Sequence, residues 1–134
     1  MIAIRSTSGP NGFTLVEIIA VLLILSVLAA ISVPKFISLD ANAKEHGIHS
    51  GIAELNGRET LVWANTKLAS PDGWQNDDQV FAGIDTDLGT DYKWIGAVDA
   101  NGGTLAFRAS ASAVLTRVSS DSRTPGRWTR NNNP

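Results

Sequence analysis

The chain has 134 residues, a formal net charge of −2 and no cysteine. This length suits one domain plus an anchor. The charge shows no overall basic excess that would point to nucleic acid, and the lack of cysteine excludes disulfides and cysteine-ligated metals.

Residues 1–12 end in a cluster of helix-breaking residues, Gly9, Pro10, Asn11 and Gly12. We expect no stable helix to cross this cluster. An extended, accessible segment of this kind is what a peptidase requires.

From Phe13 to Pro34 the chain is apolar, and Glu17 is its only charged residue. A helix of about 22 residues is long enough to cross a hydrocarbon core of about 30 Å. A carboxylate inside a membrane costs roughly 2.5–3.5 kcal/mol even on lenient insertion scales. The sequence therefore marks Glu17 as a functional residue.

The run Gly12-Phe13-Thr14-Leu15-Val16-Glu17, followed by this apolar helix, resembles the class III signal of type IV pilins and pseudopilins. The resemblance covers residues 1 to about 68 and includes Pro34. It implies that a prepilin peptidase cleaves after Gly12 and that Phe13 becomes an N-methylated terminus. It also implies that Glu17 pairs with the terminal amine of a neighbouring subunit during assembly. Phe13 and Glu17 are four residues apart on one helix face, so a pair within one subunit is the competing arrangement.

Two other interpretations of the N-terminus are an ordinary secretory signal and a plain membrane anchor. Ala30-Ile31-Ser32 could serve as a signal-peptide cleavage site, but Glu17 opens the apolar run and Pro34 follows the site almost at once. A plain anchor would explain the length of the run but not the Gly-Phe junction.

Beyond Pro34, where we expect a kink, the pattern predicts that the helix continues to Ala69. Its apolar residues recur on one side at Ile37, Ala41, Ile48, Ile52, Leu55 and Val62. Gly47 and Gly51 would serve close helix packing in a filament or are simply tolerated. The turn-forming run at residues 70–73 ends the helix.

The sequence of the remaining chain predicts a small head built on an antiparallel sheet. Residues 71–91 form a loop that Trp74 and Phe81 anchor, and strands follow at residues 92–98, 104–109 and 113–118. The turn between the first two strands contains Asn101-Gly102. Residues 119–134 are mostly tail, with a short edge strand at residues 126–129. The fold class is thus α+β, with a long bent N-terminal helix packed on the sheet.

An acidic run and a pair of histidines are candidate metal sites. Asp85, Asp87 and Asp91 alternate around Gly89, as in loops that hold calcium, and the competing interpretation is an acidic surface loop. His46 and His49 are three residues apart on the helix, but they lack a third ligand nearby in sequence.

The C-terminal region is basic and contains an aromatic residue. Arginines that surround an aromatic can hold single-stranded nucleic acid, and the competing interpretations are a solvated tail and docking on a neighbouring subunit. The residues concerned are Arg117, Arg123, Arg127, Arg130 and Trp128.

These observations predict a leader at residues 1–12, a membrane and filament-core helix at 13–34, and a head at 35–134 whose sheet spans about 92–130. The resemblance implies a structural, non-enzymatic subunit of a type IV pilus-like filament. Its expected partners are the prepilin peptidase and methylase, an inner-membrane assembly platform, the inner membrane and other pilin subunits. The alternatives are a pseudopilin of a type II secretion system and a DNA-binding competence pilin. No cofactor is expected apart from the calcium hypothesis.

Overall fold

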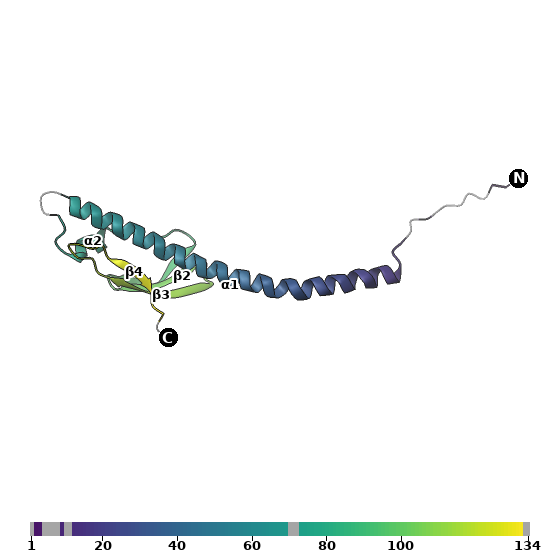
Figure 1. The fold of residues 1–134 in the computed structure, drawn as a ribbon. Helices are drawn as coiled ribbons and strands as arrows, with labels where there is room; N and C mark the ends of the chain where they lie inside the picture. Colours follow the sequence, from purple (N-terminus) through teal and green to yellow (C-terminus); the bar gives the residue numbers. More distant parts are fainter. Residues whose placement is uncertain (1, 4–8, 10–11, 70–72, 133–134) are drawn as a thin grey trace. The chain divides into compact units, whose positions relative to one another are not determined.

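The computed structural model describes residues 2–3, 9, 12–69 and 73–132 of the chain (Figure 1). The chain divides into two units, Met1–Leu39 and Asp40–Pro134. A single helix, α1 (Leu15–Leu68), contributes to both units and has Pro34 inside it. The predicted helix at residues 13–69 is confirmed to within two residues at each end.

In the first unit, no other described helix or strand packs against α1. Its side chains from Leu15 onward are exposed, apart from Ser32, which is half-buried. The Ser26 and Ser32 hydroxyls donate hydrogen bonds to the backbone carbonyl oxygens of Leu23 and Leu28, respectively, each at 2.7 Å. Such bonds satisfy a hydroxyl in apolar surroundings.

In the second unit, α1 packs on a four-stranded antiparallel sheet in the order β1-β2-β3-β4. The strands are β1 (Tyr92–Asp99), β2 (Gly102–Phe107), β3 (Ala111–Val118) and β4 (Arg127–Arg130). The α+β class and the presence of these strands are confirmed, but β2 lies two residues earlier than the expected 104–109. The turn between β1 and β2 lies at Ala100-Asn101, because Asp99 pairs directly with Gly102.

The core lies between α1 and the inner face of the sheet. Alternate residues of β3 point inward, as a half-buried strand requires. The core cluster consists of Ile48, Leu55, Leu105, Ala113, Leu115 and Trp128.

Two helix glycines permit close approach of the sheet to α1. A Cβ at Gly47 would lie 2.4 Å from the Phe107 ring, and one at Gly51 would lie 2.8 Å from the Tyr92 ring. Both aromatic side chains therefore pack against the helix where any other residue would clash. The structure supplies a reason for these glycines within the head itself.

The prediction of a plain loop at residues 71–91 is wrong, because it contains helix α2 (Asp77–Gly83). Asn76 caps this helix by accepting a hydrogen bond from the backbone N–H of Gln79, at 3.1 Å. Asp77 and Asp78 in the first turn also favour the positive end of the helix dipole. Val80 is fully buried, and Phe81 packs on the core as predicted. Of the turn predicted at residues 70–73, residues 70–72 lie outside the described residues.

The prediction that residues 119–134 are mostly tail is also wrong. Ser120, Gly126 and Trp128 are buried, and the side chain of Asn56 bonds both the backbone N–H and the carbonyl of Trp128. Two backbone carbonyls of the preceding loop accept bonds from α1. Trp63 Nε1 donates to Asp121 at 2.9 Å, and Lys67 Nζ donates to Ser122 at 2.6 Å.

Candidate functional site

The start of α1 is held by a reciprocal pair of hydrogen bonds. The backbone N–H of Glu17 donates to Thr14 Oγ1 at 3.2 Å, and the backbone N–H of Thr14 donates to Glu17 Oε2 at 3.3 Å. This is a capping box, which satisfies two backbone N–H groups that have no partner in the helix. The Thr-x-x-Glu spacing in the sequence could have revealed it.

The capping box holds the Glu17 carboxylate at the exposed end of the helix. Gly12 and Phe13 precede the helix, and 79 % of Phe13 is exposed. In the part of the chain that the structure describes, no lysine or arginine forms an ion pair with Glu17. The carboxylate is therefore free to meet a positive charge from outside this chain.

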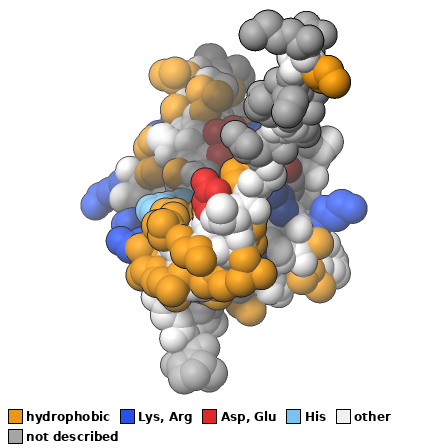
Figure 2. Space-filling view, turned by 90° about the vertical axis from the view of Figure 1, so that its right-hand side faces the viewer, with side chains coloured by type: hydrophobic (Ala, Val, Ile, Leu, Met, Phe, Trp, Pro, Cys, Tyr) orange, Lys and Arg blue, Asp and Glu red, His pale blue; other side chains and the backbone are white. Residues whose placement is uncertain are grey.

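The apolar part of α1 offers a large exposed surface. Figure 2 shows hydrophobic side chains gathered mainly in the lower part of the view. Among the described residues, α1 is the one helix long and apolar enough to cross a membrane, and none of its most apolar stretch is buried. Exposed apolar surface on this scale indicates contact with lipid or with another protein.

The head contains a buried network of charges that the sequence analysis did not anticipate. The Arg117 guanidinium forms a two-pronged pair with Glu59, with Nε–Oε2 at 2.8 Å and Nη2–Oε1 at 2.7 Å. It forms a second pair with Asp77, with Nη1–Oδ2 and Nη2–Oδ1 both at 2.7 Å. The side chains of Glu59 and Arg117 are fully buried, and 18 % of the Asp77 side chain is exposed.

Neighbouring groups complete this network. Trp128 Nε1 donates to Glu59 Oε2 at 3.0 Å, and both the backbone N–H and the hydroxyl of Ser120 donate to Asp77 Oδ1 at 2.7 Å. Gly126 leaves room for the carboxylate, because a Cβ there would lie 2.3 Å from Glu59 Oε1. The network around Arg117 therefore connects α1, α2, β3 and β4.

Hydrogen bonds from Arg117, followed by those from Ser120, lower the pKa of Asp77 from 3.8 to about 2, against the opposing effect of burial. Burial disfavours the charge on Arg117, but the bonds to Asp77 and Glu59 outweigh it and raise the arginine's pKa. Asp77 and Arg117 can thus remain charged inside the head.

A gap in the helix pattern could have pointed to Glu59. The buried side of α1 steps from Ile48 through Ile52 to Leu55, and the next position on that side is Glu59. A carboxylate at a core position needs a buried cation. The sequence does not reveal which arginine supplies it.

The C-terminal arginines do not form one surface, which corrects the predicted DNA patch. Arg117 is buried in the network and 1 % of Trp128 is exposed, so neither can contact DNA. Arg130 pairs with Glu45 on α1. Arg123 and Arg127 are exposed.

The three acidic residues proposed for calcium also serve other contacts. Asp85 and Asp87 each accept a bond from the backbone two residues later, at 2.9 Å, and Asp91 pairs with Arg108 at 3.2 Å. The Arg58 guanidinium donates to the carbonyl oxygens of Asp85 and Asp87 at 2.8 and 2.7 Å. No cluster of three or more potential ligands occurs among residues 2–3, 9, 12–69 and 73–132. Calcium binding stays a prediction of the sequence.

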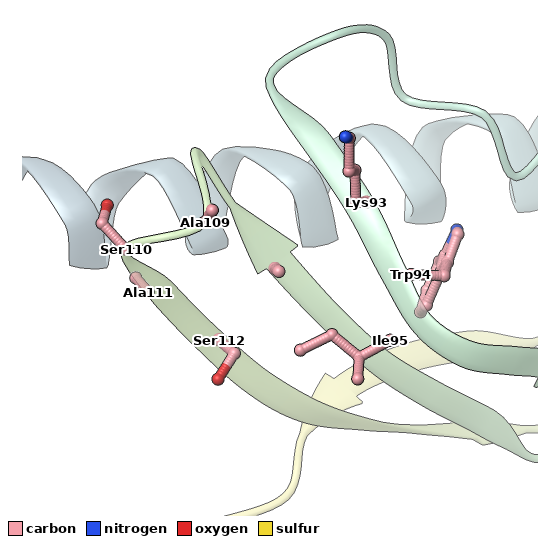
Figure 3. Close-up of a pocket in the computed structure, with 8 residues that line it drawn as sticks. Lys93, Trp94, Ile95, Ala109, Ser110, Ala111 and Ser112 are labelled. Atoms are coloured by element: carbon pink, nitrogen blue, oxygen red, sulfur yellow. The ribbon is translucent and has the colours of Figure 1, made fainter.

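A shallow pocket of about 540 Å³ lies on the sheet (Figure 3). Its lining comes from β1, β2, β3 and the loop between β2 and β3. Lys93 is the only titratable residue in the lining. The pocket contains none of the residues that the sequence singled out.

Comparison with known proteins identifies the N-terminal segment. Residues 8–33 match the family described as the prokaryotic N-terminal methylation motif. The chain is also 27 % identical over 114 residues to the type IV narrow pilus major component PilA5 of Thermus thermophilus. That alignment covers 85 % of this chain and 92 % of the relative. No solved structure matches the chain significantly.

Proposed function

Because this chain belongs to the type IV pilin and pseudopilin family, we propose that it is a structural subunit of a type IV pilus-like filament. The observation that carries the proposal is a Gly12-Phe13 junction that lies just ahead of Glu17 and of an apolar stretch of α1, none of which is buried. Such a helix must be covered by lipid before assembly and by other subunits afterwards.

In this proposal the precursor is a single-pass protein of the inner membrane. A prepilin peptidase removes residues 1–12 and Phe13 is methylated, after which an assembly platform moves the subunit into the filament. Glu17 then meets the new ammonium of a neighbouring Phe13. The two charges are each costly in apolar surroundings, and together they neutralise one another.

The name of the relative favours a pilus over the pseudopilus of a type II secretion system, because PilA5 is the major component of a narrow type IV pilus. The pseudopilin remains the alternative within the same family. The DNA-binding alternative is weaker, since Arg117 and Trp128, two of the five residues proposed for it, are buried.

Mass analysis of the N-terminus of mature protein tests this proposal. We expect the chain to begin at Phe13 and to carry one additional methyl group. A chain that begins at Val33 would identify an ordinary signal peptide and overturn the proposal. The Gly12→Ala variant provides a matched comparison and should accumulate as uncleaved precursor.

A further inference from the structure

Lys35 is the first charged residue after Glu17, at the far end of the uncharged run of α1. The two residues are separated by 18 helical steps, about 27 Å at ~1.5 Å per residue. This distance is close to the thickness of a bilayer's hydrocarbon core, about 30 Å. With Glu17 at one face of the membrane, Lys35 lies at the other.

Lys35 differs from the other basic residues of α1 because its ammonium has no partner among the described residues. Lys44 pairs with Asp40 at 2.5 Å, Arg58 pairs with Glu54 at 2.8 Å, and Lys67 bonds the Ser122 carbonyl. Lys35 has neither an ion pair nor a hydrogen bond from its side chain in residues 12–69 and 73–132.

The surroundings of Lys35 combine apolar and polar groups as a membrane boundary does. A shallow hollow of about 250 Å³ lies beside it, lined by Ile31, Ser32, Lys35, Phe36 and Leu39. Phe36 is 70 % exposed and Leu39 is 62 % exposed. Lysine stems can lie along acyl chains while the ammonium reaches the headgroups.

We infer that Lys35 and this hollow form a phospholipid-binding boundary site, in which the ammonium binds a headgroup phosphate and the apolar side chains contact the upper acyl chain. The inference rests on the proposed membrane stage of the subunit and adds its ligand. The unpaired positive charge complements the phosphate, and the site fixes how deep the helix lies before assembly.

The depth of a reporter in proteoliposomes tests this inference. The natural chain has no cysteine, so Ala41→Cys allows one nitroxide label at an exposed position of α1. The mature protein, which begins at Phe13 in the proposed function, would be reconstituted in phosphatidylcholine vesicles with and without phosphatidylglycerol. The label's accessibility to oxygen and to a water-soluble nickel complex then gives its depth.

Two of three changes at Lys35 should move this label, in opposite directions. Lys35→Leu lengthens the apolar run and should move the label inward by up to about one helical turn, ~5 Å. Lys35→Glu should move it outward in the anionic vesicles, and high salt should reduce that shift. Lys35→Arg should retain the natural depth. Lys44→Gln is the matched control, because Lys44 already has a partner in Asp40, and it should leave the depth unchanged.

Equal depths for the natural chain, Lys35→Leu and Lys35→Glu in both lipids would overturn the inference. Normal depth with a reduced yield of sheared filaments would instead assign Lys35 to a contact with a second copy, and would also overturn it. Terminal mass analysis of the same variants keeps the two proposals apart. A mature terminus at Phe13 without any depth effect defeats only the lipid site, whereas failure to mature at Phe13 defeats the proposed function.

Discussion

At Arg117, all five N–H donors of one guanidinium are used inside the protein. Four go to the carboxylates of Glu59 and Asp77, and the fifth goes to the carbonyl oxygen of Ala100 at 3.1 Å. The buried charges are therefore tolerated because their hydrogen bonds are complete. No buried side-chain nitrogen or oxygen lacks a partner among the described residues.

Replacing Arg117 should destabilise the head strongly. Arg117→Met leaves two carboxylates facing one another without a cation, and loss of one partner of a buried pair costs about 3–5 kcal/mol. The free energy of unfolding, measured by urea titration of the detergent-solubilised full chain, should fall by that amount. Arg108→Met is the matched control, because Arg108 and Asp91 form an exposed pair that water screens, so its loss should change the free energy of unfolding little. Equal losses in the two variants would contradict this prediction.

The Asp77 carboxylate should make stability depend on pH in a narrow acidic range. Its pKa is about 2 in the folded chain against an ordinary value of 3.8, so the unfolded state binds the proton more readily. The stabilisation is fully present above about pH 4 and is lost as the pH falls through about 2. Asp77→Asn should flatten this part of the stability profile measured by thermal unfolding. An unchanged slope between pH 4 and 2 in the variant would show that other carboxylates cause it.

At the scale of single elements, α1 is the clearest example of one helix in two environments. Its first part is exposed on all sides, and its second part buries Ile48, Gly51, Leu55 and Glu59 against the sheet. The glycines of the second part differ in what surrounds them. Gly47 faces the Phe107 ring, whereas nothing lies within 4 Å of a Cβ at Gly57.

Alanine at these two glycines should have opposite effects on stability. Gly47→Ala forces the Phe107 ring away from the helix, and overpacking of this kind costs about 1–3 kcal/mol. Gly57→Ala places a methyl group in open space and should stabilise the helix by up to about 1 kcal/mol. Thermal unfolding of both variants under the same conditions measures the difference. If Gly47→Ala is as stable as Gly57→Ala, the close contact with Phe107 is not required.

The helix α2 and the loop at residues 119–126 are peripheral elements that the charge network attaches to the core. Asp77 begins α2, and Ser120 lies just after β3. Ser120 and Arg117 both donate hydrogen bonds to one oxygen of Asp77, Oδ1. In a chain without cysteine, these bonds fix the two segments where a covalent link is absent.

At the scale of the whole molecule, the proposed function depends on what covers the exposed apolar part of α1. In the proposed function, Glu17 makes the difference between a passive anchor and a subunit that assembles. The carboxylate stands at the start of the helix and is oriented by Thr14. The Glu17 carboxylate is exposed at this position, so the ammonium of a neighbouring subunit could reach it.

The Glu17→Leu variant should separate insertion from assembly. Leucine makes the helix more apolar, so the variant should reach the membrane and be cleaved. The ammonium of a neighbouring Phe13 would then be buried without a partner, which costs more than the pair itself contributes. We expect the sheared filament fraction to be lost while the mature subunit stays in the membrane fraction, as measured by blotting both. Normal filament yield would show that Glu17 has no pairing role, and Thr14→Ser, which keeps the capping hydroxyl, should assemble normally.

The sequence by itself determined the features that depend on neighbouring residues. The helix at residues 15–68, the four strands and the N-terminal methylation motif all follow from local composition, periodicity and turn residues. The tertiary structure alone decided which distant charges meet. Glu59 and Arg117 are 58 positions apart, and Asp77 has no local mark that distinguishes it from Asp78 or Asp85. Arg117 and Trp128 were candidates for a surface site, but they are core residues. They are buried because the Glu59 carboxylate, on the packed side of α1, requires their N–H groups as hydrogen-bond donors.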